Sequence, residues 1–392
     1  MKRAMVFTIP ERGHYHPLLG PARELERRGL EVVWAAPADI RAELAAAGVE
    51  QVVLPPGAPP PADALRGKAL TELLADPSAL AGWIRAMLVD AQTELIAPYR
   101  EMIRRVQPSV VAIDTMVYAA AIAAELEGVP WVGWSTSLNP VIPTTMRSTL
   151  ISTLEALDPQ RHALFEQHGS TARFRVSDVL SPRGTAVFTT SAVVPEPDDP
   201  SIRMVGPSLG GYRTGALPEI PERGTRPLVY ASFGSQAWYQ PERFERIIAA
   251  ATRFDLALIA SMGELVTEFR ARGLPPTIRC EAHVDQLAVL QQADVIVTHA
   301  GANSVMESLA AGVPMLLAPI CNDQPHNRTM VERCGAGQGI DLESASVDEI
   351  GGALRHLAGP GTHRDASERI AASYRAHDGS RGAADLAWEA MA

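Results

Sequence analysis

Short apolar runs alternate with longer helical patterns along most of the chain, and this alternation predicts the fold class. Runs that indicate strands lie at residues 5–9, 30–36, 52–54, 110–113 and 130–132, and again from 228 onward at 228–233, 256–260, 278–280, 294–298 and 314–318. Helical patterns at 17–28, 70–105 and 143–168 separate strands of the first series. Because such alternation is typical of parallel sheets covered on both faces, we expect an α/β protein with doubly wound parallel sheets.

A stretch rich in Pro and Gly, residues 206–226, separates the two series and has the composition of a linker. The chain of 392 residues is long for one domain and comfortable for two. We therefore predict a first domain at 1–206, a linker at 207–226, a second domain at 227–377 and a final helix at 378–392. Two doubly wound domains place the carboxyl ends of both sheets at one cleft, where ligands bind.

Residues 298–328 hold a strand end, a run of small residues and a helix. Asn303 and Ser304 are favoured residues for a helix entrance, where free backbone N–H groups and the helix dipole together hold a phosphate. His299 and the Ser304 hydroxyl would add donors. Glu307 lies one turn further on, where a carboxylate can accept both hydroxyls of a ribose. The alternative is an ordinary strand-loop-helix with a capping serine and a solvated glutamate.

Two histidines and an acid stand at strand ends of the first half. His14 and His16 lie in the predicted loop 11–17 after the first strand, at the cleft end of the sheet. Asp114 directly follows a buried apolar run, where an acid usually needs a partner. Asp114 has the alternative role of capping the helix predicted near Met116, and His16 that of a loop histidine that bonds backbone or shapes an acceptor site.

Composition and charge exclude several classes of protein. With 46% hydrophobic and 20% charged residues and a net charge of −10, the chain is an ordinary globular protein without the basic face that a nucleic-acid partner requires. The sequence has no Gly-x-Gly-x-x-Gly motif, which disfavours a nicotinamide dehydrogenase.

Cysteine usage and hydropathy indicate a cytoplasmic protein. Cys280, Cys321 and Cys334 lack metal-type spacing and are expected to be buried thiols in a reducing compartment. The apolar run at 4–9 is too short for a signal peptide, and no run approaches the roughly 20 residues that span a membrane.

The stretch 281–327 resembles the donor-sugar signature of the family-one nucleotide-sugar glycosyltransferases, which include plant natural-product glucosyltransferases and bacterial macrolide glycosyltransferases. It begins His283-Val284-Asp285-Gln286-Leu287 and runs through the 298–328 segment described above. The resemblance implies the GT-B fold, two Rossmann-like doubly wound domains facing a central cleft, with a final helix that crosses back to the first domain. It also implies an enzyme that moves a sugar from a nucleotide-sugar co-substrate to a small-molecule acceptor.

The resemblance also assigns donor-binding roles by position. His299, Gly301, Asn303 and Ser304 would contact the diphosphate with Gly234 and Ser235, Glu307 the ribose, Thr136, Asp323 and Gln324 the sugar, and Gln286 the nucleoside or the local fold. The Asp-Gln pair is associated with glucose, so UDP-glucose is the expected donor. His283 replaces the usual stacking Trp, which leaves a dTDP-sugar open, and Ala302 replaces a second Trp beside the sugar.

The resemblance assigns the catalytic pair as well. His14 matches the base of a Gly-His-x-x-Pro motif, and Asp114 matches the acid that bonds its far nitrogen. A neutral imidazole near pH 7 would then take the proton of an acceptor hydroxyl, and a single displacement would invert the anomeric centre without a metal or other cofactor.

The acceptor site is the least defined part of the prediction. His16, Met87, Ile142 and Met146 are expected to contribute to a wall suited to a lipophilic alcohol, although the apolar residues fit a helix core equally well. Two other functions stay open. One is a metal-dependent hydrolase, because His14-x-His16 after a first strand also opens amidohydrolase barrels, and the other is an epimerase-like protein that holds a nucleotide-sugar without transferring it.

Overall fold

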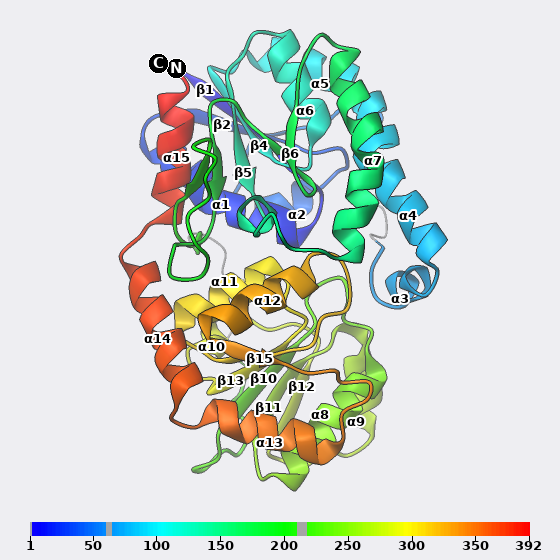
Figure 1. Ribbon diagram of the computed structural model, residues 1–392, viewed down its shortest axis with the longest axis vertical. Helices are drawn as coiled ribbons and strands as arrows, with labels where there is room; N and C mark the ends of the chain where they lie inside the picture. Colours follow the sequence, from blue (N-terminus) through cyan, green and yellow to red (C-terminus); the bar gives the residue numbers. More distant parts are fainter. Residues whose placement is uncertain (1, 60–64, 210–217) are drawn as a thin grey trace.

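Two open, all-parallel sheets, one in each half of the chain, form the centre of the computed structural model, which describes residues 2–59, 65–209 and 218–392 (Figure 1). The first sheet has the order β3-β2-β1-β4-β5-β8-β9 and the second β12-β11-β10-β13-β14-β15. An antiparallel hairpin of β6 (Arg173–Arg175) and β7 (Asp178–Leu180) lies beside the first sheet. The predicted α/β class with two doubly wound parallel sheets is confirmed, and the open sheets contradict the barrel that a hydrolase of the amidohydrolase type requires.

The strands are short and match most of the apolar runs. The first sheet consists of β1 (Arg3–Phe7), β2 (Glu31–Ala35), β3 (Val52–Val53), β4 (Val110–Asp114), β5 (Trp131–Ser135), β8 (Thr185–Val187) and β9 (Ile202–Met204). The second consists of β10 (Leu228–Ser232), β11 (Ala257–Ser261), β12 (Ile278–Glu281), β13 (Val295–Thr298), β14 (Met315–Leu317) and β15 (Gly337–Gly339). The pattern missed β6 to β9 and β15, because three-residue strands carry too few positions for a period to show.

Helices cover both faces of each sheet. Around the first sheet lie α1 (Arg12–Arg27), α2 (Arg41–Ala46), α3 (Lys68–Leu74), α4 (Pro77–Arg85), a π-helical turn at Ala86–Asp90, α5 (Ala91–Val106), α6 (Tyr118–Leu126), a 3₁₀ turn at Asn139–Val141 and α7 (Thr149–Glu166). The second half carries α8 (Pro241–Arg253), a 3₁₀ turn at Gly263–Leu265, α9 (Val266–Ala271), α10 (Gln286–Leu290), α11 (Ala302–Ala311), α12 (Gln324–Cys334), α13 (Val347–Ala358) and α14 (Thr362–Arg375), and α15 (Gly379–Glu389) ends the chain. No helix in the described ranges is both long and apolar enough to cross a membrane.

Alternate residues of each strand enter different cores. Met5 and Phe7 of β1 pack with α5 and α6, whereas Ala4 and Val6 pack with α1 and α15. This period of two, apolar on both faces, is what a parallel sheet buried between helices requires. One of the cores continues across both halves, so the two sheets are held against each other by apolar contacts as well as polar ones.

The last helix returns to the first half of the chain. In Figure 1 α14 runs along the second sheet and α15 lies beside the first, with the two termini side by side. Trp134 of β5 donates through its indole nitrogen to the Ala383 carbonyl at 3.0 Å, and Arg28 pairs with Asp385 at 2.7 Å. The boundaries proposed at 206, 226 and 377 stay predictions, and residues 210–217 of the predicted linker lie outside the described residues.

The first helix begins earlier than the sequence suggested, and its prolines explain two contacts. The segment 12–17 is the first part of α1 instead of a loop, because the His14 and Tyr15 amides bond the Glu11 carbonyl at 2.9 and 3.0 Å. Pro17 and Pro21 lie inside this helix and lack an amide N–H, so the carbonyls four residues earlier have no helical partner. The Gly13 carbonyl accepts from Asn303 instead, and the Pro17 carbonyl accepts from Ser208.

Candidate active site

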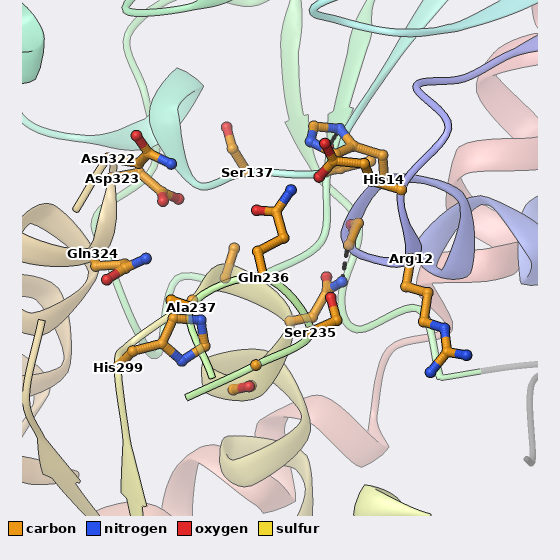
Figure 2. A pocket seen from close by; sticks show the side chains of 18 of the residues that line it. Arg12, His14, Ser137, Ser235, Gln236, Ala237, His299, Asn322, Asp323 and Gln324 are labelled. Atoms are coloured by element: carbon orange, nitrogen blue, oxygen red, sulfur yellow. Dashed lines mark hydrogen bonds between the residues drawn. The ribbon is translucent and has the colours of Figure 1, made fainter. Parts of the chain in front are cut away.

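A cavity of about 490 Å³ lies between the two halves, at the carboxyl ends of both sheets. Its walls come from the β1–α1, β5–α7 and α4–α5 regions of the first half and from the β10–α8, β12–α10, β13–α11 and β14–α12 connections of the second. Figure 2 shows His14 and Arg12 on one side of this cavity, Asn322, Asp323 and Gln324 on the other, and His299, Ser235 and Gln236 between them. The cavity is therefore where parallel α/β sheets usually bind ligands.

His14 and Asp114, 100 residues apart in the sequence, meet at the first sheet. The His14 Nδ1 atom lies 2.7 Å from Asp114 Oδ2, and the Asp114 side chain is completely buried. Asp114 Oδ1 accepts from the Met116 amide at 3.1 Å, but Val117 is the N-cap of α6, whose start has no side-chain cap hydrogen bond, so Asp114 does not cap that helix. The described hydrogen bonds of the His14 ring use Nδ1, which leaves Nε2 for a ligand in the cavity.

Thr136 belongs to the same cluster. Its hydroxyl lies 3.0 Å from His14 Nδ1 and 3.3 Å from Asp114 Oδ2. The resemblance places this hydroxyl on the donor sugar, whereas in the structure it contacts the histidine and the acid. The residue still lines the cavity, so both contacts are within its reach.

The environment of His14 favours its charged form. Burial lowers the pKa of His14, but the Asp114 charge and hydrogen bond, with further contributions from Glu11 and Asp178, outweigh burial and raise this pKa to about 9. This shift contradicts the expectation of a neutral imidazole near pH 7, because an adjacent carboxylate stabilises the imidazolium. The neutral form that accepts a proton grows as the pH rises toward 9.

A second buried acid, Asp178, was missed by the sequence analysis. Five side chains donate to its carboxylate at 2.6 to 3.3 Å: Thr115, Ser135, Ser137, Asn139 and Ser177. Ser135 and Ser137 flank Thr136, and Thr115 directly follows Asp114. Asp178 therefore holds both loops that carry the partners of His14. The polar run 135–137 after a buried strand was visible in the sequence, but nothing near Asp178 linked it to that run.

On the opposite side of the cavity, His299 lies between two glycines. A Cβ atom on Gly234 would lie 2.8 Å from the His299 ring, and one on Gly301 would lie 2.5 Å from its Nε2 atom. Burial lowers the pKa of His299 to about 4, so this imidazole is neutral at pH 7. Gly234, Ser235, His299 and Gly301 all line the cavity, as expected for a diphosphate site.

The entrance of α11 differs in detail from the prediction. Gly301, rather than Asn303 or Ser304, is the N-cap, because β13 ends at Thr298 and the chain turns through Ala300 with a positive φ of 68°. Asn303 donates across the cleft to the Gly13 carbonyl at 2.9 Å. The first turn of α1 therefore touches the first turn of α11.

Gln286 connects the remaining residues of this wall. Its amide nitrogen donates to Ser304 at 3.3 Å and to Glu307 at 2.6 Å, and its oxygen accepts from Tyr230 at 3.2 Å. Burial raises the pKa of Glu307 to about 7, although the Gln286 hydrogen bond opposes this shift. Ser304, predicted at the diphosphate, and Glu307, predicted at the ribose, are thus joined through Gln286 at the start of α10.

The predicted sugar-reading pair stands at the start of α12. Asp323 accepts from Asn327 at 2.9 Å, and burial raises the pKa of its carboxyl group. Gln324 accepts from the Ile320 and Cys321 amides at 2.7 and 2.9 Å through its side-chain oxygen. Both residues line the cavity, and Figure 2 shows them facing it from the wall opposite His14.

His283 and two of the four predicted acceptor residues also line the cavity. His283 is exposed there, and burial together with the Arg12 and Arg66 charges lowers its pKa. His16 and Met87 lie on the cavity wall. Burial, with a contribution from Arg12, lowers the pKa of His16 to about 4.

The other two predicted acceptor residues do not line the cavity. Ile142 is buried in the core and Met146 packs against that core, so neither reaches the cavity surface. Their apolar character had the helix-core explanation that the sequence left open. Besides Met87, the apolar part of the cavity wall contains Leu70, Trp83, Ile84, Leu88, Met116, Leu150 and Leu154.

Within the described residues, no group of three or more His, Cys, Asp or Glu side chains has an arrangement that could hold a metal ion.

Comparison with known proteins agrees with this geometry. Residues 245–380 match the family described as the C-terminal domain of erythromycin biosynthesis protein CIII-like proteins. The chain is 27% identical to an oleandomycin glycosyltransferase of Streptomyces antibioticus over 97% of this chain and 89% of that protein. The crystal structure of a kitacinnamycin glycosyltransferase covers 100% of this chain and 99% of its own, with 27% identity and a TM-score of 0.80. That of the glycosyltransferase VinC in complex with dTDP covers 99% of each chain, with 20% identity and a TM-score of 0.72.

The fold, the cavity and these matches define a class of protein. Residues 245–380 match that family's C-terminal domain, and the chain over its whole length is similar to macrolide and other natural-product glycosyltransferases with two parallel α/β domains. It is a glycosyltransferase.

Proposed function

We propose that this glycosyltransferase moves glucose from UDP-glucose to a hydroxyl of a lipophilic natural product, with inversion at the anomeric carbon and without a metal ion. The observation that carries the proposal is that His14, paired with Asp114, faces the entrance of α11 across a single cavity. A base and a phosphate-binding helix end on opposite walls are the arrangement that a direct displacement requires.

In the proposed reaction, the acceptor oxygen attacks the anomeric carbon and its proton moves to His14 Nε2. Asp114 keeps Nδ1 protonated and stabilises the imidazolium that forms. The bond from the sugar to the β-phosphate oxygen breaks, and its electron pair leaves with the nucleoside diphosphate. The backbone N–H groups at the start of α11 then stabilise this charge, with His299 as an additional donor, because they point at the leaving group before the reaction begins.

The donor assignment rests on Asp323, Gln324 and His283. The Asp-Gln pair on the wall of the cavity supports glucose, through hydrogen bonds to the sugar hydroxyls. His283 stacks more weakly on a base than a Trp would, so this residue does not select uracil over thymine. A dTDP-sugar is therefore the competing donor, and the relative VinC has been crystallised with dTDP.

The acceptor assignment rests on the apolar wall from α3, α4 and α7. Leu70, Trp83, Ile84 and Leu154 line the cavity on the same side as His14, which favours a hydrophobic molecule with one hydroxyl at the base. The similar protein of Streptomyces antibioticus is an oleandomycin glycosyltransferase, which supports a natural-product acceptor.

A two-part experiment tests the proposal. Thermal shift against UDP, dTDP, GDP and their glucose conjugates identifies the nucleotide, because a ligand that binds only the folded protein raises the midpoint. Transfer is then measured with the stabilising donor and a panel of phenolic and aliphatic alcohols, with and without EDTA. Stabilisation by GDP-sugars alone would refute the donor assignment, and loss of activity with EDTA would refute the metal-independent mechanism.

The same assay distinguishes the epimerase-like alternative from the proposed transferase. A protein that binds a nucleotide-sugar, changes it without any acceptor, and keeps full activity in His14→Ala and Asp114→Asn would not be a transferase with this base.

A further inference from the structure

The charges around the cavity do not match those of its proposed ligand. Four acids line it, namely Glu11, Asp285, Glu307 and Asp323, and among its lining residues in the described ranges Arg12 is the one lysine or arginine. A nucleoside diphosphate brings two or more negative charges into this acidic surrounding. Helix dipoles and neutral donors offset part of that charge, but a permanent cation offsets more.

The histidines of the cavity do not supply this charge. His16 and His299 have pKa values lowered to about 4, and the pKa of His283 is lowered as well, so these three rings are neutral at pH 7. The pKa of His14 is raised to about 9, but its positive charge is already paired with Asp114. Arg12 is therefore the one unpaired cation on the described walls.

The position of Arg12 brings it to the seam between the halves. It is the first residue of α1, and its side chain is exposed and forms no hydrogen bond or ion pair within the described part of the chain. The next residue, Gly13, accepts the hydrogen bond from Asn303 on the first turn of α11. In Figure 2 the Arg12 side chain extends away from His14, out of the catalytic cluster.

The effect of the Arg12 charge on two histidines indicates the same location for its side chain. The Arg12 charge acts on His16 of its own half and also on His283, where the nucleotide base is proposed to lie. The guanidinium is thus close to the nucleotide end of the cavity rather than to the sugar end at Asp323.

Resting on the nucleotide-sugar transfer proposed above, we propose that Arg12 binds the diphosphate of the donor from across the cleft. The α11 entrance holds the diphosphate from one half of the protein, and Arg12 holds it from the other. Binding of the donor then also fixes the two halves in the closed arrangement that Asn303 and Gly13 already make. A guanidinium suits this role because it offers two parallel N–H groups to a phosphate.

The test measures nucleotide binding by calorimetry at pH 7. UDP, UMP and uridine, and in parallel dTDP, dTMP and thymidine, are titrated into the wild type, Arg12→Gln and Arg12→Lys. Arg253→Gln is the matched control, because Arg253 is exposed on α8 and pairs with Asp348 away from the cavity. We expect Arg12→Gln to weaken diphosphate binding about tenfold, Arg12→Lys to restore part of it, and nucleoside binding to stay unchanged.

Ionic strength gives a second measurement. Raising the salt concentration should weaken diphosphate binding more in the wild type and Arg253→Gln than in Arg12→Gln, since exposed charge pairs are screened. Equal diphosphate affinity and equal salt dependence in Arg12→Gln and the wild type would overturn the proposal. So would equal weakening of uridine and UDP, which would place Arg12 at the base.

The assay distinguishes this proposal from the one that it rests on. If no nucleotide binds the wild type, the glycosyltransferase assignment to these donors fails. If nucleotides bind the wild type and Arg12→Gln alike, only the role of Arg12 fails.

Discussion

Two histidines face each other across one cavity with opposite protonation. Burial lowers the pKa of both His14 and His299, yet the pKa of His14 is raised to about 9 and that of His299 is lowered to about 4. The two pKa values differ because the two histidines have different neighbours. His14 lies 2.7 Å from Asp114, whereas His299 is enclosed by Gly234 and Gly301. A carboxylate within hydrogen-bond distance outweighs desolvation, and where it is absent desolvation decides.

This difference divides the proposed chemistry between the two halves. The first half holds a titratable base, whose acid partner and supporting loops are tied together by Asp178. The second half offers a neutral histidine and backbone N–H groups, which in the proposed reaction hold a phosphate without changing charge in the working pH range. Each half can then be altered separately, and changes in one should affect turnover while changes in the other affect donor binding.

The largest expected effect comes from removing the acid in Asp114→Asn. Turnover should fall on the order of 10³ to 10⁴, because the amide neither fixes the tautomer nor stabilises the imidazolium. Turnover of the wild type should rise with pH toward the His14 pKa of about 9, since the neutral ring is the base. In Asp114→Asn the charge and hydrogen bond of Asp114 no longer act on His14, while burial still does and Glu11 and Asp178 oppose it only in part, so this rise should move to lower pH.

The measurement is kcat against pH from 6 to 10 with saturating donor. Asp348→Asn serves as a control, because Asp348 is an exposed carboxylate paired with Arg253. An unchanged pH profile in Asp114→Asn would mean that Asp114 does not set the charge of His14.

The next largest effect is expected from Gly301→Ala. The new Cβ atom would lie 2.5 Å from His299 Nε2, so the ring must move and the α11 entrance with it. We expect nucleoside diphosphate affinity to fall about 10- to 100-fold and the protein to lose about 1–3 kcal/mol of stability. Calorimetry and thermal unfolding measure the two quantities.

Gly352→Ala is the matched control for this change. Gly352 lies inside α13, and nothing is within 4 Å of an added Cβ there, so the variant should be as stable as the wild type or up to about 1 kcal/mol more stable. If Gly301→Ala binds the diphosphate as tightly as Gly352→Ala does, the glycines around His299 do not shape a donor site.

A smaller effect should appear in the pH dependence of donor binding. The pKa of Glu307 is raised to about 7, so its carboxylate, the form that accepts ribose hydroxyls, is populated as the pH rises through 7. Nucleotide affinity of the wild type should therefore increase up to about tenfold more between pH 6 and 8 than that of Glu307→Gln. Because both proteins are titrated with the same nucleotide, ionisation of the nucleotide affects both affinities equally and cancels when the two proteins are compared. Parallel curves would show that Glu307 does not contact the ribose.

The smallest effect is expected from Thr136→Val, which keeps the shape of the side chain and removes its hydroxyl. The hydrogen bonds at 3.0 and 3.3 Å to His14 and Asp114 are lost, and turnover should fall about 3- to 10-fold with the donor KM unchanged. A rise in donor KM with unchanged kcat would instead indicate that Thr136 contacts the donor sugar, as the resemblance implies. Steady-state kinetics with varied donor decide between the two.

Local sequence signals predicted the parts of the fold that depend on neighbouring residues. The strand and helix alternation, the α11 segment after β13 and the Asp-Gln start of α12 all show as short patterns, and the structure contains each of them. The start of α1 was misjudged because Pro17 is favoured in a first turn, whereas here it lies inside the helix. Ile142 and Met146 were misassigned because an apolar side chain looks the same in a core and on a ligand wall.

By itself, the sequence determined the fold class, the segment predicted to hold a phosphate and the two residues proposed as base and acid, because periodicity and motif spacing are local. Only the tertiary structure decided the burial, the hydrogen-bond partners and the neighbouring charges of those residues. Asp178 joins loops that are 41 and 63 residues away in the chain, at Ser137 and Thr115, and Gly13 meets Asn303 across 290 residues. The opposite charges of His14 and His299 have the same origin, since a pKa depends on burial and on which charges lie within a few ångströms, and those neighbours are brought together by folding.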